Sequence, residues 1–163
     1  MPKFYAGVGS RETPVNMLRF MKKLAGKLEK DGWILRSGAA RGADTAFEDG
    51  VDDPEMKEIF LAHHATFESM EIAKSTHPAW GKCGPYAKQL HGRNTMQILG
   101  EDLRTPVSFL VCWTKDGAIC QKERSFITGG TGTAIAIAEK YKVPVYNLIR
   151  DSHFERIQKF CSL

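Results

Sequence analysis

Residues 33–44 have the sequence WILRSGAARGAD, in which a short apolar run, Trp33 to Arg36, continues directly into a glycine-rich loop. The run has the length of a buried strand, and the apolar residues from Ala43 onward predict a helix after the loop. A strand that enters a helix through a glycine loop is the repeating unit of parallel α/β sheets. This stretch therefore indicates the fold class.

The same alternation extends in both directions along the chain. Short apolar runs predict strands at Lys3–Val8, Trp33–Arg36, Lys57–Ala62, Val107–Trp113 and Val143–Leu148. Helices are expected after Thr13 as N-cap with Pro14 in first position, from Ala43, over Asn94–Leu99, after the GGTGT run and from about Ser152. Residues 63–92 are polar and broken by proline and glycine, which predicts an irregular stretch with one or two short helices. We expect one Rossmann-like α/β domain over residues 1–163, a three-layer sandwich with a mostly parallel, doubly wound sheet.

Composition excludes several classes of protein. With 163 residues, 42% hydrophobic and 26% charged, the chain is neither disordered, collagen-like nor a coiled coil. It contains no apolar run of membrane-spanning length and no secretory signal, so we expect a cytoplasmic protein. Its four cysteines form no CxxC pair, which favours reduced thiols. The net charge of +4 is compatible with an anionic partner but is too small to indicate nucleic-acid binding by itself.

Three glycine-rich loops, Gly9–Arg11, Ser37–Asp44 and Gly129–Thr133, each follow a predicted strand or open a predicted helix. The carboxyl ends of parallel strands meet at one edge of a sheet, so these loops should converge there. Glycine lets backbone N–H groups approach a phosphate closely, and a helix N-terminus adds a partial positive charge. The loops therefore predict a phosphate-binding site.

Charged and aromatic residues near these loops complete the candidate site. The guanidinium forks of Arg11, Arg41 and Arg93 suit phosphate, although each is also compatible with an ordinary surface arginine. Asp44 is a candidate acceptor for ribose hydroxyls or a simple helix cap. Trp113, which ends a predicted strand, is the best candidate to stack on a base, ahead of Trp80, Tyr86 and Phe126; core packing is the alternative. The candidate ligand-binding residues are Gly9, Ser10, Arg11, Ser37, Gly38, Arg41, Gly42, Asp44, Arg93, Asn94, Trp113, Gly129, Gly130, Thr131, Gly132 and Thr133.

Metal and covalent chemistry have weaker support in the sequence. His63 and His64 are adjacent and, on a strand, would face opposite sides. His77, Cys83 and His91 match no standard zinc spacing, so we expect neither metal nor cofactor. No candidate nucleophile has a sequence-adjacent base, and no catalytic residue is assigned.

Four segments resemble a known family: YAGVGSRETP (5–14), LRSGAARGADTAFEDG (35–50), HGRNTMQILG (91–100) and GGTGTAIAIAEKYKVPVYN (129–147). In this order they are similar to the core of the DNA-processing protein A (Smf/DprA) family, within the SLOG superfamily that also contains the lonely-guy phosphoribohydrolases. Single-domain proteins with this opening look common among bacteriophage genes, so the resemblance also implies a phage-encoded member. The resemblance implies a Rossmann-like fold that binds nucleotides, nucleotide-derived signals or single-stranded DNA, often as a dimer.

One departure from the lonely-guy pattern bears on function. Those enzymes carry a catalytic glutamate after their glycine-threonine motif, whereas Ala134, Ile135 and Ala136 follow Thr133 here. The leading hypothesis is a protein that binds a nucleotide or nucleotide-derived ligand through the glycine-rich loops at the carboxyl edge of the sheet. The alternatives are a single-stranded-DNA-binding DNA-processing protein and a nucleotide N-glycosidic-bond hydrolase.

Overall fold

In the computed structural model, which describes residues 1–163, five parallel strands form one sheet in the order β3-β2-β1-β4-β5. The strands are β1 (Lys3–Gly7), β2 (Trp33–Ser37), β3 (Lys57–Ile59), β4 (Leu110–Cys112) and β5 (Val145–Asn147). The chain builds outward from β1 through β2 to β3, then returns to the other side of β1 for β4 and β5. The parallel, doubly wound sheet expected from the sequence is confirmed. Its strand order reverses between β1 and β4, where such sheets bind ligands.

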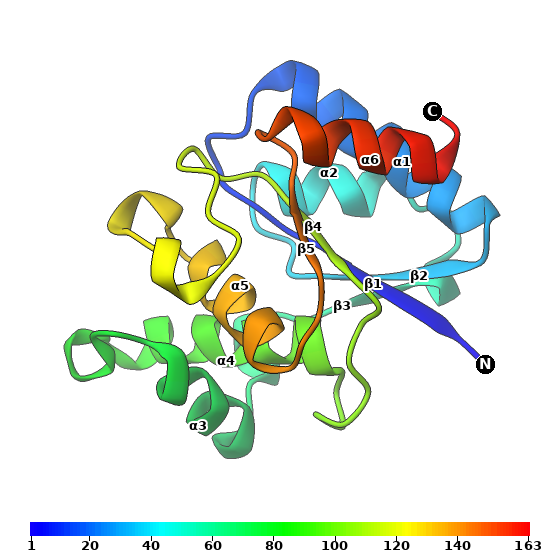
Figure 1. Cartoon of the computed structure of the whole chain (residues 1–163). Coiled ribbons are helices and arrows are strands. Elements are labelled where there is room, and N and C mark those ends of the chain that lie inside the picture. The colour runs from blue at the N-terminus through cyan, green and yellow to red at the C-terminus, as the bar shows by residue number, and fades with distance from the viewer.

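Helices cover both faces of this sheet (Figure 1). One layer contains α1 (Val15–Lys30), α2 (Ala43–Asp49) and α6 (Asp151–Cys161), and the other contains α3 (Phe67–Thr76), α4 (Pro85–Leu99) and α5 (Thr131–Lys140). The three layers are those of a Rossmann-like sandwich.

Each face of the sheet has its own apolar core. On one side Tyr5 packs with Leu24 of α1 and Phe47 of α2; on the other, Ile98 of α4 packs with Ile135 of α5. Burying a side chain of this size contributes about 1.5–3 kcal/mol. None of the helices has both the length and the apolar character needed to cross a bilayer.

The main difference from the sequence-based expectation lies in residues 63–92. The prediction of an irregular stretch with one or two short helices there was right only in part: α3 is such a helix, but α4 already begins at Pro85, so helix occupies most of the segment. Thr66 and Ser69 cap the start of α3 reciprocally, and Pro85 occupies the first turn of α4 directly after Gly84. Proline in a first turn starts a helix as readily as it ends one.

Smaller differences concern element ends. His63 and His64 lie on a short 3-10 turn, Ala62–His64, rather than on a strand, and their rings are 4.2 Å apart between centroids. Thr13 does not cap α1, since Pro14 is its N-cap residue. The Thr13 hydroxyl donates instead to the Ser10 carbonyl oxygen across 2.6 Å and closes the first glycine loop.

Candidate functional site

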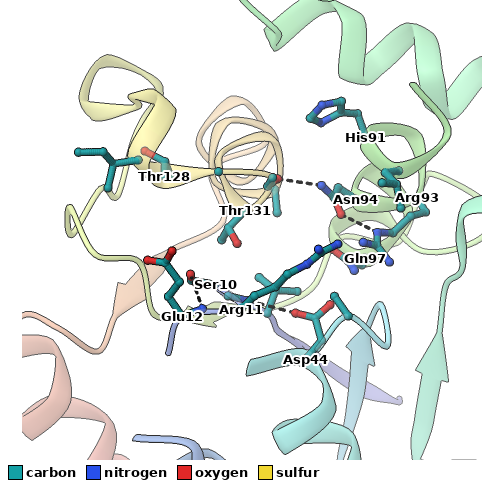
Figure 2. A pocket seen from close by; sticks show the side chains of 18 of the residues that line it. Ser10, Arg11, Glu12, Asp44, His91, Arg93, Asn94, Gln97, Thr128 and Thr131 are labelled. Carbon is teal, nitrogen blue, oxygen red and sulfur yellow. Dashed lines mark hydrogen bonds between the residues drawn. The ribbon is translucent and has the colours of Figure 1, made fainter. Parts of the chain in front are cut away.

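A cleft of about 610 Å³ opens at the carboxyl ends of β1 and β4, where the strand order reverses (Figure 2). Its walls come from the loop after β1, the start of α2, the middle of α4 and the segment that leads into α5. Its volume is typical of sites for small ligands. Nine of the candidate residues line it: Gly9, Ser10, Arg11, Asp44, Arg93, Asn94, Gly129, Gly130 and Thr131.

Four candidates from the second glycine loop lie outside the cleft. Ser37 is buried and donates to the Gly7 carbonyl oxygen across 2.6 Å. Gly38 packs directly under Arg93 and Gln97. Gly42 has φ of +92°, and a Cβ there would lie 2.6 Å from the Ser10 carbonyl oxygen. These residues let β2, α2 and the first glycine loop pack closely, while Arg41 is exposed beside them.

Two candidates from the late glycine loop also lie behind the cleft wall. A Cβ at Gly132 would lie 2.6 Å from Arg124 Nε, so this glycine makes room for the arginine. Thr133 is fully buried, and its Oγ1 accepts from Arg124 Nη2 at 2.8 Å. Neither residue lines the cleft.

Trp113, expected from the sequence to stack on a base, does not line the cleft. Its carbonyl oxygen accepts from the Ser10 N–H at 3.0 Å, so its backbone reaches the expected edge. Its indole, however, is 7% exposed and packs in the same core as Val111. Alternate residues of an extended chain face the same side, which places Trp113 toward α1 rather than in the cleft. The aromatic side chain that lines the cleft is Phe126, which is 94% exposed.

Two guanidinium groups converge in the cleft. Arg93 donates from Nη1 to the Gly38 carbonyl oxygen at 2.6 Å and from Nε to Asn94 Oδ1 at 2.8 Å. Arg11 extends from the first glycine loop toward Arg93 and Gln97 (Figure 2). Burial lowers the pKa of Arg93, and the charge of Arg11 acts in the same direction. An anion between two such cations would be strongly attracted.

Asp44 forms part of the cleft floor and is 3% exposed. Its Oδ1 accepts from the Gly9 N–H at 3.2 Å, which holds the first glycine loop against α2. Burial raises the pKa of Asp44 to about 6, although the charge of Arg93 acts against the rise. The carboxyl group therefore changes charge close to physiological pH.

Gln97 is a cleft residue that the sequence interpretation missed. It is 1% exposed, and neither amide atom has a hydrogen-bond partner. Leaving a buried amide unpaired costs about 1–3 kcal/mol, so such groups at a cleft point to a ligand that satisfies them. Gln97 follows Arg93 by one helical turn on α4, and that spacing was the available signal.

The segment before α5 forms the outer wall of the cleft. Asp116 organises it by accepting from the hydroxyl groups of Ser125 and Thr128, the first at 2.9 Å. The side chain of Asn94 donates to the Gly130 carbonyl oxygen at 2.9 Å. Since α5 begins at Thr131, which lines the cleft, the positive end of its dipole lies there. The N–H groups of Gly132 and Thr133 donate to the carbonyl oxygens of Gly129 and Gly130.

Comparison with known proteins gives one informative match. No protein-family model and no curated protein matches the sequence. Among solved structures, DNA processing protein A from Helicobacter pylori, described for its unique single-stranded DNA binding mode, superposes with a TM-score of 0.64. The chain shares that protein's fold. The likeness covers 99% of this chain and 79% of DNA processing protein A, at 14% sequence identity.

Proposed function

We propose that this chain binds single-stranded DNA in a DNA-processing role, with a backbone phosphate held in the cleft. The observation that carries the proposal is the convergence of Arg11 and Arg93 beside the N-terminus of α5. Two guanidinium forks and a helix N-terminus form a site for a phosphate. The fold shared with DNA processing protein A supports the choice of single-stranded DNA, and the order of the four motifs supports placement in the SLOG superfamily.

The rim of the cleft favours a polymeric ligand. Phe126 is 94% exposed and Ile127 is 49% exposed, and both line the cleft beside Lys115. An exposed aromatic ring next to a basic groove is the usual arrangement for single-stranded nucleic acid, because any base can stack on the ring. Phe126 would stack on a base next to the phosphate bound in the cleft.

A second candidate, a free nucleotide or nucleotide-derived ligand, rests on Gln97. Its unpartnered amide offers one donor and one acceptor in the interior of the cleft. This pair would match the hydrogen-bonding edge of a base or another amide-like group. The carboxylates that line the cleft are Glu12 and Asp44; the one carboxylate of α5, Glu139, does not line it. Because no carboxylate of α5 reaches the cleft, we favour binding of this ligand over its hydrolysis. The homodimer implied by the resemblance stays a prediction.

A salt titration tests the proposal. Fluorescence anisotropy would follow binding of labelled oligo-dT, with unlabelled mono-, di- and triphosphate nucleotides as competitors, across a range of salt concentrations. Single-stranded DNA binding predicts that log K falls with log salt by about 0.7 for each phosphate contacted. Affinity for oligo-dT that does not change with salt would overturn the proposal. Tight, salt-tolerant binding of one small nucleotide would favour the second candidate.

A further inference from the structure

Three side chains from separate elements come together beside the cleft. His77 follows the end of α3, Cys83 follows the short 3-10 helix Trp80–Lys82, and His91 lies on α4. One ligand atom from each lies within 4.8 Å of the other two, and all three residues are half-buried. The sequence considered alone disfavours a metal at this trio because its spacing matches no standard zinc pattern, but the folding of residues 63–92 into α3 and α4 brings the three side chains together.

We propose that His77, Cys83 and His91 bind a divalent transition metal of the zinc type. Imidazole nitrogen and thiolate sulfur are the preferred ligands of zinc. The distance between Cys83 Sγ and His77 Nε2 is 3.8 Å. Two such ligands on one tetrahedral zinc ion lie about 3.5 Å apart, given Zn–S and Zn–N bonds of about 2.3 and 2.0 Å. The three ligand atoms lie within 4.8 Å of one another, so the cluster would contract by up to about 1–1.5 Å around the ion.

Burial around both imidazoles disfavours their protonated forms. Burial lowers the pKa of His91 to about 4 and also lowers that of His77. The two ring centroids are 4.5 Å apart, so two protonated rings would repel each other. The charge of Arg124 lies close enough to Cys83 to interact favourably with a thiolate.

Hydrogen bonds orient the rings. His91 Nδ1 lies 2.7 Å from Thr133 Oγ1, which leaves Nε2 free to coordinate. His77 Nδ1 accepts from the Ala79 N–H at 3.0 Å, so in the metal-free protein the proton of this ring sits on Nε2. When Nε2 binds metal, this proton moves to Nδ1, and the hydrogen bond from Ala79 breaks. Metal binding therefore changes the environment of the Ala79 amide.

Three protein ligands leave a tetrahedral ion with one open position. Structural zinc sites fill all four positions with protein, whereas an open position accepts water or an anionic oxygen. His91 also lines the cleft, next to Arg93 and Asn94 in the sequence. The metal would thus lie at the border of the proposed phosphate site, although its binding does not depend on that function.

Cobalt substitution tests the site. The reduced protein, freed of metal by a chelator, would be titrated with Co²⁺ and then with Zn²⁺ as competitor. We expect one ion per chain, the visible d–d bands of tetrahedral cobalt, a thiolate-to-cobalt charge-transfer band, and loss of these bands on adding zinc. A shift of the Ala79 amide signal in the NMR spectrum should accompany zinc binding. An octahedral spectrum without the charge-transfer band would overturn the proposal.

Variants assign the ligands. Cys83→Ser should remove the charge-transfer band and weaken zinc binding by about 100-fold or more, whereas Cys120→Ser, which alters a half-buried thiol outside the cluster, should behave like the native protein. Equal zinc affinity in Cys83→Ser and the native protein would overturn the proposal. Should Cys83→Ser fail to fold, zinc K-edge X-ray absorption on the native protein decides. One sulfur at about 2.3 Å and two nitrogens at about 2.0 Å support the site, and an all-oxygen shell refutes it.

Discussion

The side-chain amide of Asn94 donates to the carbonyl oxygen of Gly130 across 2.9 Å, while its Oδ1 accepts from Arg93 Nε at 2.8 Å. Arg93 in turn donates to the Gly38 carbonyl oxygen. A single turn of α4 therefore connects the late glycine loop to the loop after β2. This connection fixes the width of the cleft and the direction of the Arg93 guanidinium.

Removing that connection should affect binding more than folding. Asn94→Ala leaves the Gly130 carbonyl oxygen to water and costs about 1 kcal/mol of stability, because Gly130 is exposed. Affinity for oligo-dT should fall by about 10-fold, since Arg93 and the α5 N-terminus lose their fixed separation. Thermal unfolding and fluorescence anisotropy measure the two effects. Native affinity in a folded Asn94→Ala protein would show that this connection does not position the site.

Arg11 and Arg41 form a matched pair, because both are exposed arginines near glycine loops but only Arg11 lines the cleft. Arg11→Gln should weaken oligo-dT binding by about 10-fold and reduce the salt slope by about 0.7, the loss of one phosphate contact. Arg41→Gln should change neither quantity. Equal losses in the two variants would point to a diffuse electrostatic surface instead of the cleft.

Asp44 predicts a pH dependence of stability. Its folded-state pKa of about 6 lies above the ordinary value of 3.8. The native state therefore binds more protons than the unfolded state between these pH values. The contribution of Asp44 to the free energy of unfolding is most favourable below pH 4 and falls as the pH rises through 6. At pH 7 the ionised carboxylate lowers the stability by roughly 2–3 kcal/mol relative to low pH.

Comparing Asp44→Asn with the native protein isolates the effect of Asp44 ionisation on stability. Asparagine retains an oxygen for the Gly9 N–H but does not ionise. The stability of Asp44→Asn relative to the native protein should therefore rise between pH 4 and pH 7, measured by urea unfolding at each pH. A difference that is constant over this range would mean that Asp44 ionises normally.

Stacking of a base on Phe126 should contribute to the affinity for single-stranded DNA. Phe126→Ala should lower the affinity for oligo-dT by about 1–3 kcal/mol, because the ring would lose its contact with a base. Its stability should be unchanged, since the ring is 94% exposed. Phe67→Ala, which removes a ring that is 77% exposed away from the cleft, provides the control. If both variants bind like the native protein, Phe126 contacts no base.

Local sequence patterns were sufficient for the sheet and for part of the cleft. Apolar runs such as Trp33 to Arg36 located all five strands, and the loops after β1 and before α5 do line one cleft. Strand ends and glycine loops are determined by residues that are neighbours in the sequence, so a local sequence pattern is enough to predict them. The long apolar run of α5, buried along most of its length, was also visible in the sequence.

The missed features depend on tertiary contacts. Whether Trp113 points into the cleft or the core depends on the side of the sheet that α1 and α6 cover. Gln97 becomes a cleft residue only because α4 packs across the end of β2. The approach of His77, Cys83 and His91 likewise requires α3 and α4 to pack together, and no spacing rule contains that information.

The most direct test of the cleft as the DNA site is Gly130→Leu. A Cβ at Gly130 meets no atom within 4 Å, and its φ of −61° is accessible to any residue, so the variant should fold with a Tm close to native. Gly81→Leu is the matched control, because Gly81 is equally open and lies outside the cleft. Anisotropy with labelled oligo-dT at low salt should show at least about a 10-fold loss for Gly130→Leu and none for Gly81→Leu. Native affinity in a folded Gly130→Leu protein would contradict the account.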